Sequence, residues 1–324
     1  MNRQISKFSA PRPAAHGKAN CLVAVVMAFV FLAGCANKSR PVSTPAHLQR
    51  SQTIQDQLSE IAEQAQGRVG VFAALIETNE RIASLNPQGH FPMQSVYKLP
   101  ICMAVMKQVD AGKLRLDQKV KIATEDYVPE AAHSPIRDKY PKGTELTVNE
   151  LLRFALSESD GTASDVLLKL AGNATVREFL ASLPVTDIVV LDTEKELAKD
   201  WQAQYRNSAT PEAAVALLAK LYEQRGLSGP SRDLLLKYMT ESTPGVKRLK
   251  GLLPAGTPVA HKTGTSGMQD GITAATNDIG IVTLPNGTHL AIAVFVSDSP
   301  ASETVREGVI AKLAKSIFDS VNAK

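Results

Sequence analysis

The pattern of apolar and polar positions divides the start of the folded chain into a helix and a β-hairpin. Apolar side chains recur at helical spacing over residues 47–66, and Gly67 ends that pattern. Residues 69–76 are apolar and rich in β-prone side chains, so they are predicted to form a strand. Polar residues 77–80 then form the turn, and 81–85 is the predicted returning strand.

The middle of the chain is predicted to be mostly helical, and strands return near its end. Helical spacing predicts helices over 99–109, 147–158, 162–171, 175–182, 210–224 and 231–239. The proline-containing and polar stretches predict loops over 127–142 and 193–208. Strand character marks 259–262, 278–284 and 289–297. An amphipathic helix over 305–321 is predicted to close the chain.

Segments of matching type at the two ends, around a helical middle, predict an α/β fold. We expect an antiparallel sheet flanked by helices, built from residues 47–90 and 243–324 as one discontinuous domain. Residues 91–242 would form a second, all-helical domain. A chain of 324 residues is long enough to bury both cores.

The first 35 residues have the pattern of an export signal. Basic residues are followed by an apolar run that is short for a membrane span, and then by Leu32-Ala33-Gly34-Cys35. These four residues resemble the lipobox of bacterial lipoproteins, which implies cleavage before Cys35 and lipidation of its thiol. Ala36 at the next position implies, by resemblance to Gram-negative lipoproteins, an outer-membrane anchor with the body in the periplasm. Residues 36–46 are the predicted tether.

Charge and cysteine content exclude several classes of function. The net charge is +4, but four of the 36 basic residues lie in the leader, so the exported body is nearly neutral. It has no basic stripe of the kind that nucleic acid requires. Cys102 is the single cysteine after the leader, which excludes an internal disulfide in the body and favours a buried, inert thiol. The scattered histidines lack metal-ligand spacing, so we expect no metal.

A possible catalytic pair lies just before the first central helix. Ser95 and Lys98 are three residues apart at its predicted start, and positions i and i+3 share one face of a helix. A serine hydroxyl needs a neighbouring base to become a nucleophile, and a lysine can serve where its surroundings lower its pKa. The amide groups of a helix start also favour developing negative charge. Alone, this pair is also compatible with an ordinary capped surface helix.

Three further motifs argue that the spacing of Ser95 and Lys98 is not a chance occurrence. Ser159-Asp160-Gly161 follows a predicted helix, His261-Lys262-Thr263-Gly264-Thr265 ends a predicted strand, and Glu194-Lys195-Glu196-Leu197 lies in a polar loop. With Ser95 and Lys98, their order and spacing resemble the motif set of class A serine β-lactamases. Short stretches of the sequence, such as residues 271–275, most resemble those of the extended-spectrum subgroup found in Bacteroides and related bacteria. The resemblance covers nearly all of the body, and it implies the β-lactamase/D,D-peptidase fold, with its active site in a cleft between the two domains.

The resemblance implies a role for each motif in acyl transfer. Ser95 would be the nucleophile, Lys98 a candidate base, and Ser159 the donor of a proton to the departing ring nitrogen. Lys262 would supply a cation near that hydroxyl and near the substrate carboxylate. The remaining implied substrate contacts come from Thr263, Gly264 and Thr265. The amides of Ser95 and Thr265 would form the oxyanion hole.

Two further residues are implied by their position relative to these motifs. Glu194 matches the glutamate that activates the hydrolytic water, although Glu196 is a rival in the same charged loop. Whether Lys98 or Glu194 is the base for acylation stays open. Arg248 matches the position of an arginine that binds the substrate carboxylate in some class A enzymes, although it could also be an ordinary surface residue.

The chain departs from the family pattern at several positions. Gly161 stands where an asparagine usually contacts the substrate amide, and Ala198 stands where another usually holds the water. Asp192 and Asn207 replace the usual ion pair that closes this loop. We therefore expect a wider loop and altered recognition of substrate side chains.

Taken together, the residues and the resemblance predict a lipid-anchored, monomeric periplasmic β-lactamase. It would open the β-lactam amide of penicillins and cephalosporins through an acyl-serine intermediate, without a cofactor. One alternative is a penicillin-binding D,D-peptidase or transpeptidase, which shares the serine, lysine and Lys-Thr-Gly elements. The other is a non-catalytic lipoprotein that binds β-lactams or peptidoglycan fragments. The lifetime of the acyl-enzyme separates the first alternative, and the absence of ring opening separates the second.

Overall fold

The computed structural model describes residues 46–322 of the chain. The expected leader, its Cys35 and nearly all of the expected tether lie outside the described residues. The described residues belong to one compact unit. No helix among them is both long enough and apolar enough to cross a membrane.

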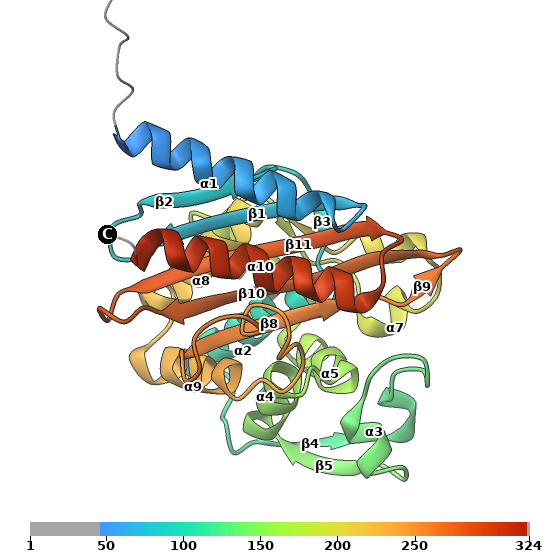
Figure 1. The fold of residues 1–324 in the computed structure, drawn as a ribbon. Coiled ribbons are helices and arrows are strands. Elements are labelled where there is room, and N and C mark those ends of the chain that lie inside the picture. The colour runs from blue at the N-terminus through green and yellow to red at the C-terminus, as the bar shows by residue number, and fades with distance from the viewer. Residues whose placement is uncertain (1–45, 323–324) are drawn as a thin grey trace, which may run out of the picture. The chain divides into compact units, whose positions relative to one another are not determined.

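An antiparallel sheet joins the two ends of the described chain (Figure 1). Its strands follow the order β2-β1-β11-β10-β8, and the short strand β9 pairs with β10 beyond the end of β8. Their bounds are β1 Arg68–Leu75, β2 Arg81–Leu85, β8 Val259–Thr265, β9 Met268–Gln269, β10 Ile272–Thr283 and β11 His289–Ser299. The predicted strands are confirmed, and β8 and β10 extend beyond the sequence-based ranges.

Strand β11 shows why this sheet needs helices on both faces. Its side chains alternate between two hydrophobic cores, as the two-residue period of a strand requires. Leu290, Ile292 and Val294 face one core, whereas Ala293 and Phe295 face the other. Residues 290–296 of the strand are therefore all apolar and buried.

The terminal helices cover the first of these cores. Helices α1 (Ala46–Glu63) and α10 (Glu303–Asn322) lie side by side on one face of the sheet, in blue and red (Figure 1). The second core lies between the opposite face and the helices from the middle of the chain. These are α2 Lys98–Asp110, α4 Val148–Ser157, α5 Gly161–Ala171, α6 Asn173–Ser182, α8 Pro211–Tyr222 and α9 Gly229–Thr240.

Helix α2 is the centre of this second core. Its residues from Lys98 to Met106 are all buried, so its sequence is apolar around nearly its whole circumference. Cys102 is completely buried there, and burial raises the pKa of its thiol to about 12, as expected for an inert cysteine. Helix α4 begins with a capping box, in which Thr147 and Glu150 bond reciprocally.

Residues 91–242 also contain small strands that the sequence did not indicate. Strands β3 (Phe91–Pro92), β7 (Ser208–Ala209) and β6 (Ile188–Val189) form one small sheet. Strands β4 (Lys119–Ile122) and β5 (Thr144–Thr147) form another. The region therefore combines helices with short β-pairs, which are too brief to leave a periodic pattern.

The two predicted loops contain short helices. Within 127–142, Ser134 caps helix α3 (Pro135–Lys139), and Pro135 takes the first helical position, which needs no amide proton. Within 193–208 lie helix α7 (Glu194–Leu197) and the 3₁₀ turn η3 (Gln202–Tyr205). Two other 3₁₀ turns are η1 (Gln94–Tyr97) and η2 (Thr124–Asp126).

Candidate active site

Ser95 and Lys98 lie on one continuous helical segment. Ser95 is in turn η1, and Lys98 begins helix α2 directly after it. Ser95 is partly exposed, whereas the Lys98 side chain is only 1% exposed. An accessible hydroxyl and a buried amine are thus three residues apart on this segment.

Lys98 is held between two of the predicted motifs. Its Nζ lies 2.9 Å from Oε1 of Glu194 and donates a hydrogen bond of 2.7 Å to the backbone oxygen of Ser159. The ion pair joins α2 to the polar loop, and the second contact joins α2 to the turn before α5. Lys98 thus contacts the carbonyl of Ser159 and not its hydroxyl.

The Ser159 hydroxyl is paired with a second lysine. Lys262 donates from Nζ to the Ser159 Oγ at 2.8 Å and to the Thr263 carbonyl at 3.0 Å. Lys262 is completely buried in the middle of β8. Burial, reinforced by the positive charge of Lys98, holds the pKa of Lys262 well below its usual value. A proton can thus be shared between the Lys262 amine and the Ser159 hydroxyl.

Helix α7 brings Glu194 to this cluster. The carboxylate of Asp165 on α5 accepts hydrogen bonds from the Glu194 amide at 2.7 Å and from the Lys195 amide at 3.2 Å. These amides form the start of α7, where a carboxylate is favoured. Burial raises the pKa of Asp165 to about 6, and the nearby Glu194 charge acts in the same direction, against the two amide bonds.

Capping geometry distinguishes the two candidate glutamates, Glu194 and Glu196. Glu196 accepts hydrogen bonds from the Thr193 amide at 2.8 Å and the Thr193 hydroxyl at 3.0 Å. It therefore closes a capping box and faces its own loop. Glu194 is left to pair with Lys98. Asn207 holds the same loop, since its Oδ1 accepts from the amides of Leu191 and Asp192.

Arg248 reaches the site through another side chain. Its guanidinium donates to the Thr265 Oγ1 at 2.8 Å and to the backbone oxygens of Gly264 and Asn277 at 3.3 and 3.0 Å. Its Nε pairs with Glu307 at 3.2 Å. Arg248 is only 3% exposed, so it is not an ordinary surface residue. Thr265, by contrast, is exposed at the end of β8.

Thr263 and Gly264 lie within the same buried strand. Thr263 is 3% exposed, and its methyl group packs against Gly245, where a Cβ would approach it to 2.4 Å. Gly264 lies against the chain that leads to Ser95, because a Cβ there would be 2.2 Å from the Met93 carbonyl oxygen. The close approach at Gly264 is therefore made to the protein's own backbone.

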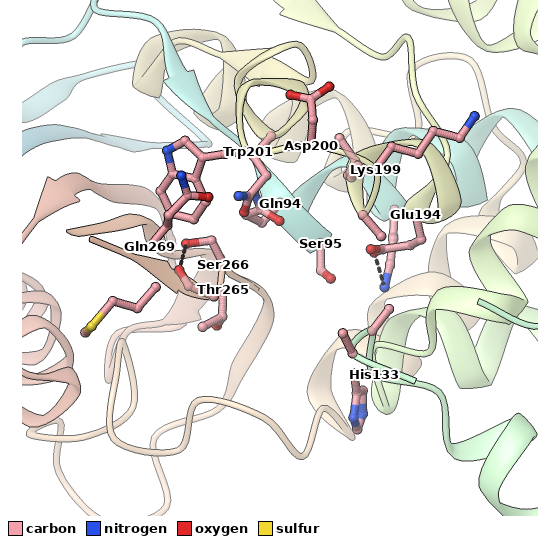
Figure 2. Close-up of a pocket in the computed structure, with 18 residues that line it drawn as sticks. Gln94, Ser95, His133, Glu194, Lys199, Asp200, Trp201, Thr265, Ser266 and Gln269 are labelled. Atoms are coloured by element: carbon pink, nitrogen blue, oxygen red, sulfur yellow. Dashed lines mark hydrogen bonds and ion pairs between the residues drawn. The ribbon is translucent and has the colours of Figure 1, made fainter. Parts of the chain in front are cut away.

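Of these residues, Ser95, Lys98, Glu194 and Thr265 line an open cleft of about 730 Å³. Figure 2 shows Ser95 within it, between Glu194 and Thr265. Trp201 and Gln204 of the polar loop also line the cleft, as do residues of the β8–β9 turn. Ala198 is exposed in the cleft wall, where its side chain offers no polar group.

The glycine at position 161 has a steric explanation. A Cβ at Gly161 would lie 3.1 Å from the Cγ of Glu194 and 3.2 Å from the carbonyl oxygen of His133. Both distances are tighter than ordinary carbon contacts. The absence of the usual asparagine therefore gives Glu194 room to approach Lys98.

Three residues around the site were missed by sequence reasoning. Asp165 lies at i+5 from Asp160 with no recognisable spacing, and Asn277 lies within an apolar strand. Trp201 had a weak signal, because it is the sole tryptophan of the chain and lies in a polar loop. Within the described residues, no group of three or more metal-ligating side chains converges.

The body of the chain is similar to known β-lactamases. A sequence profile of the β-lactamase enzyme family matches residues 53–321. Beta-lactamase VEB-1 from Pseudomonas aeruginosa is 45% identical over 252 residues, which are 76% of this chain and 83% of that protein.

Solved structures agree in sequence and in shape. A β-lactamase from Chitinophaga pinensis DSM 2588 superposes with a TM-score of 0.81 at 46% identity, over 83% of this chain and 100% of that one. A class A representative from Bacteroides cellulosilyticus DSM 14838 has a TM-score of 0.80 at 33% identity, over 85% and 99%. With the family profile spanning most of its length, the chain belongs to the class A β-lactamase family, whose members are serine hydrolases.

Proposed function

We propose that this β-lactamase opens the β-lactam ring through an acyl intermediate on Ser95. The observation that carries the proposal is the chain of contacts from Glu194 through Lys98 to Ser159 and Lys262, next to an accessible Ser95. A nucleophile, a base and a proton donor need such proximity for acyl transfer. Ser95 attacks the lactam carbonyl, and the developing oxyanion is bound by the amides of Ser95 and Thr265.

Proton transfer during acylation uses the two lysines. The Ser95 proton passes to Lys98 or, through it, to Glu194. The Ser159 hydroxyl delivers a proton to the ring nitrogen as the C–N bond breaks. Lys262 restores that proton, which its lowered pKa favours.

Deacylation depends on Glu194. A carboxylate anchored by the Asp165 cap can hold a water molecule and remove its proton as it attacks the acyl carbonyl. Because Ala198 offers no polar side chain, the water has fewer partners than the family pattern provides.

The substrate carboxylate binds near the end of β8. Lys262 supplies the charge, and the hydroxyl of Thr265 supplies a hydrogen bond, with Thr263 and Gly264 shaping the strand. Arg248 acts through Thr265, because its guanidinium donates to the Thr265 Oγ1 and so leaves the hydroxyl proton free for the substrate. This role replaces the direct contact implied by the resemblance.

A trapping experiment tests the scheme. Glu194→Gln should accumulate an adduct of benzylpenicillin on Ser95 that mass spectrometry detects, because acylation proceeds and deacylation stops. Glu196→Gln is the matched control, since glutamine also closes a capping box, and it should turn over normally. Undiminished turnover by Glu194→Gln, or an adduct that also forms on Ser95→Ala, would show that the roles are misassigned.

We also propose that the enzyme protects its host from penicillins and cephalosporins. The resemblance to the extended-spectrum subgroup and the open cleft support broad acceptance of substrate side chains. Steady-state hydrolysis of a penicillin, a cephalosporin and a carbapenem would define the range. A protein limited to penicillins would contradict the broader part of this proposal.

The location of the enzyme is a separate proposal. The leader sequence supports export to the periplasm, with a lipid on Cys35 anchoring a monomeric enzyme to the outer membrane. Cys35→Ser should release the activity from the membrane fraction and abolish labelling by palmitate. Cys21→Ser, a matched change within the apolar run, should leave both unchanged. Equal membrane binding by the two variants would exclude a lipidated Cys35.

The two-part organisation supports this arrangement of the cleft. The strands of the large sheet all come from residues 47–90 and 243–324, whereas Ser95, Ser159 and Glu194 come from 91–242. We therefore keep these ranges as the proposed domains, with the cleft between them.

A further inference from the structure

Asn277 is a buried polar residue that the scheme above does not use. It lies on β10 and is completely buried. Its Nδ2 donates to the backbone oxygen of Pro92 at 2.7 Å and to that of Met93 at 3.1 Å. Both carbonyls belong to the short stretch of chain that leads to Ser95. A polar side chain buried this deeply is costly unless its hydrogen bonds serve the fold or the site.

The stretch that Asn277 holds is strained. Gln94, the residue directly before Ser95, has a φ of +46°, a backbone angle that residues other than glycine rarely adopt. Such a conformation is unfavourable and persists only where surrounding contacts enforce it. On the other side of the same stretch, the Met93 amide donates to the Asn207 carbonyl at 2.8 Å. The backbone before Ser95 is thus fixed from two directions.

Asn277 is also tied to the opposite wall of the cleft. In the β8–β10 register it is paired with Gly264, and its neighbour Thr276 is paired with Thr265. Arg248 donates to the Asn277 carbonyl at 3.0 Å while also holding the Thr265 hydroxyl. One residue therefore connects the backbone beside Thr265 to the backbone beside Ser95.

We propose that Asn277 is a positioning residue that sets the spacing between the Ser95 and Thr265 amides of the oxyanion hole. The proposal rests on the function above, because that spacing matters only if Ser95 is acylated. Gly264 allows the two backbones to approach, and the Asn277 amide locks them at that separation.

The expected effect follows from the distance dependence of such sites. Oxyanion donors act at about 2.7–3.1 Å, and the loss of one costs about 100- to 1,000-fold in rate. A displacement of about 1 Å in a catalytic constellation costs on the order of 100-fold. Loss of the Asn277 hydrogen bonds leaves both amide donors of the oxyanion hole present but misplaced. We therefore expect kcat/KM to fall roughly 10- to 100-fold.

The test compares Asn277→Ala with Asn149→Ala in the full-length protein. Asn149 accepts a hydrogen bond from the Tyr238 hydroxyl at 2.7 Å on α4, so its truncation removes an amide contact remote from the cleft. Two quantities are measured: kcat/KM for benzylpenicillin and the affinity for phenylboronic acid. Boron accepts the Ser95 oxygen to form a tetrahedral adduct, one oxygen of which occupies the oxyanion hole. This adduct therefore reports the geometry of the hole without turnover.

The proposal expects kcat/KM and boronate affinity to fall together in Asn277→Ala and to stay unchanged in Asn149→Ala. Boronate affinity within threefold of the parent would overturn it, whatever happens to turnover. If the alanine variant does not fold, Asn277→Ser, which keeps a shorter donor, should show the same parallel loss. Retained hydrolysis by Ser95→Ala would instead overturn the proposed function, independently of Asn277.

Discussion

Asp165 gives a quantitative test of how the Glu194 helix is held. Burial raises the pKa of Asp165 from 3.8 to about 6, so this carboxyl ionises less readily in the folded protein than in the unfolded chain. One pKa unit corresponds to about 1.36 kcal/mol, so ionising Asp165 costs the fold about 3 kcal/mol at neutral pH. The stabilisation that this raised pKa gives to the folded state is complete below about pH 4. It is lost as the pH rises through about 6. Asp165→Asn removes the titration.

Urea unfolding from pH 4 to pH 8 measures this effect. The unfolding free energy of Asp165→Asn, relative to the parent, should rise by up to about 3 kcal/mol between pH 4 and pH 6 and then stay level. The lost bond to the Lys195 amide lowers this difference equally at every pH.

Asp110→Asn is a control of opposite sign. Burial acts to raise the pKa of Asp110, but hydrogen bonds from Ser231 and Ser228 outweigh it, and the pKa is lowered. Its stabilisation is complete above the unfolded pKa of 3.8 and is lost only in stronger acid, so the relative stability of Asp110→Asn should stay nearly level from pH 4 to pH 8 and rise as the pH falls below 4. A flat or falling curve for Asp165→Asn would refute the assignment of its burial penalty.

Three further experiments probe the walls of the cleft. Gly161→Asn should slow deacylation at least tenfold in single-turnover assays, because its side chain displaces Glu194; unchanged turnover would mean that the loop yields freely. Arg248→Ala should raise KM for benzylpenicillin several-fold by releasing the Thr265 hydroxyl, and an unaltered KM would exclude that route. Trp201, the sole tryptophan, should change its emission when a cephalosporin acylates the Glu194→Gln enzyme, whereas Ser95→Ala should give no such acylation-dependent change.

Local spacing explains what the sequence could predict of the site. Ser95 and Lys98 are three residues apart and share a helix face. Their proximity therefore follows from local helical geometry rather than from the tertiary fold. The capping box of Thr147 and Glu150 depends on an equally local spacing of three residues. That rule, applied to Thr193, also identifies Glu196 as a cap and leaves Glu194 as the catalytic candidate.

Long-range contacts explain what the sequence could not predict. Asn277 and Pro92 are 185 positions apart, and no spacing rule connects an asparagine in an apolar strand to a carbonyl so distant in the chain. Arg248 likewise lies between two lysines in sequence, a pattern typical of a surface, yet it is buried against β8. The two-residue strands β3, β6 and β7 are equally invisible, because so short a segment has no period.

The pairing of β1 with β11 has a consequence for how the chain acquires its structure. Arg68 and Asp298, at the end of this pair, are 230 positions apart, so the central strands meet only after nearly the whole polypeptide is present. Such non-local pairing requires the entropic cost of closing a long loop before the strand contacts can form and stabilise it. This requirement slows folding. The helical middle can collapse earlier, but the core under α1 and α10 cannot form from an incomplete chain. The sheet therefore makes completion of the polypeptide a condition for the folding of the enzyme.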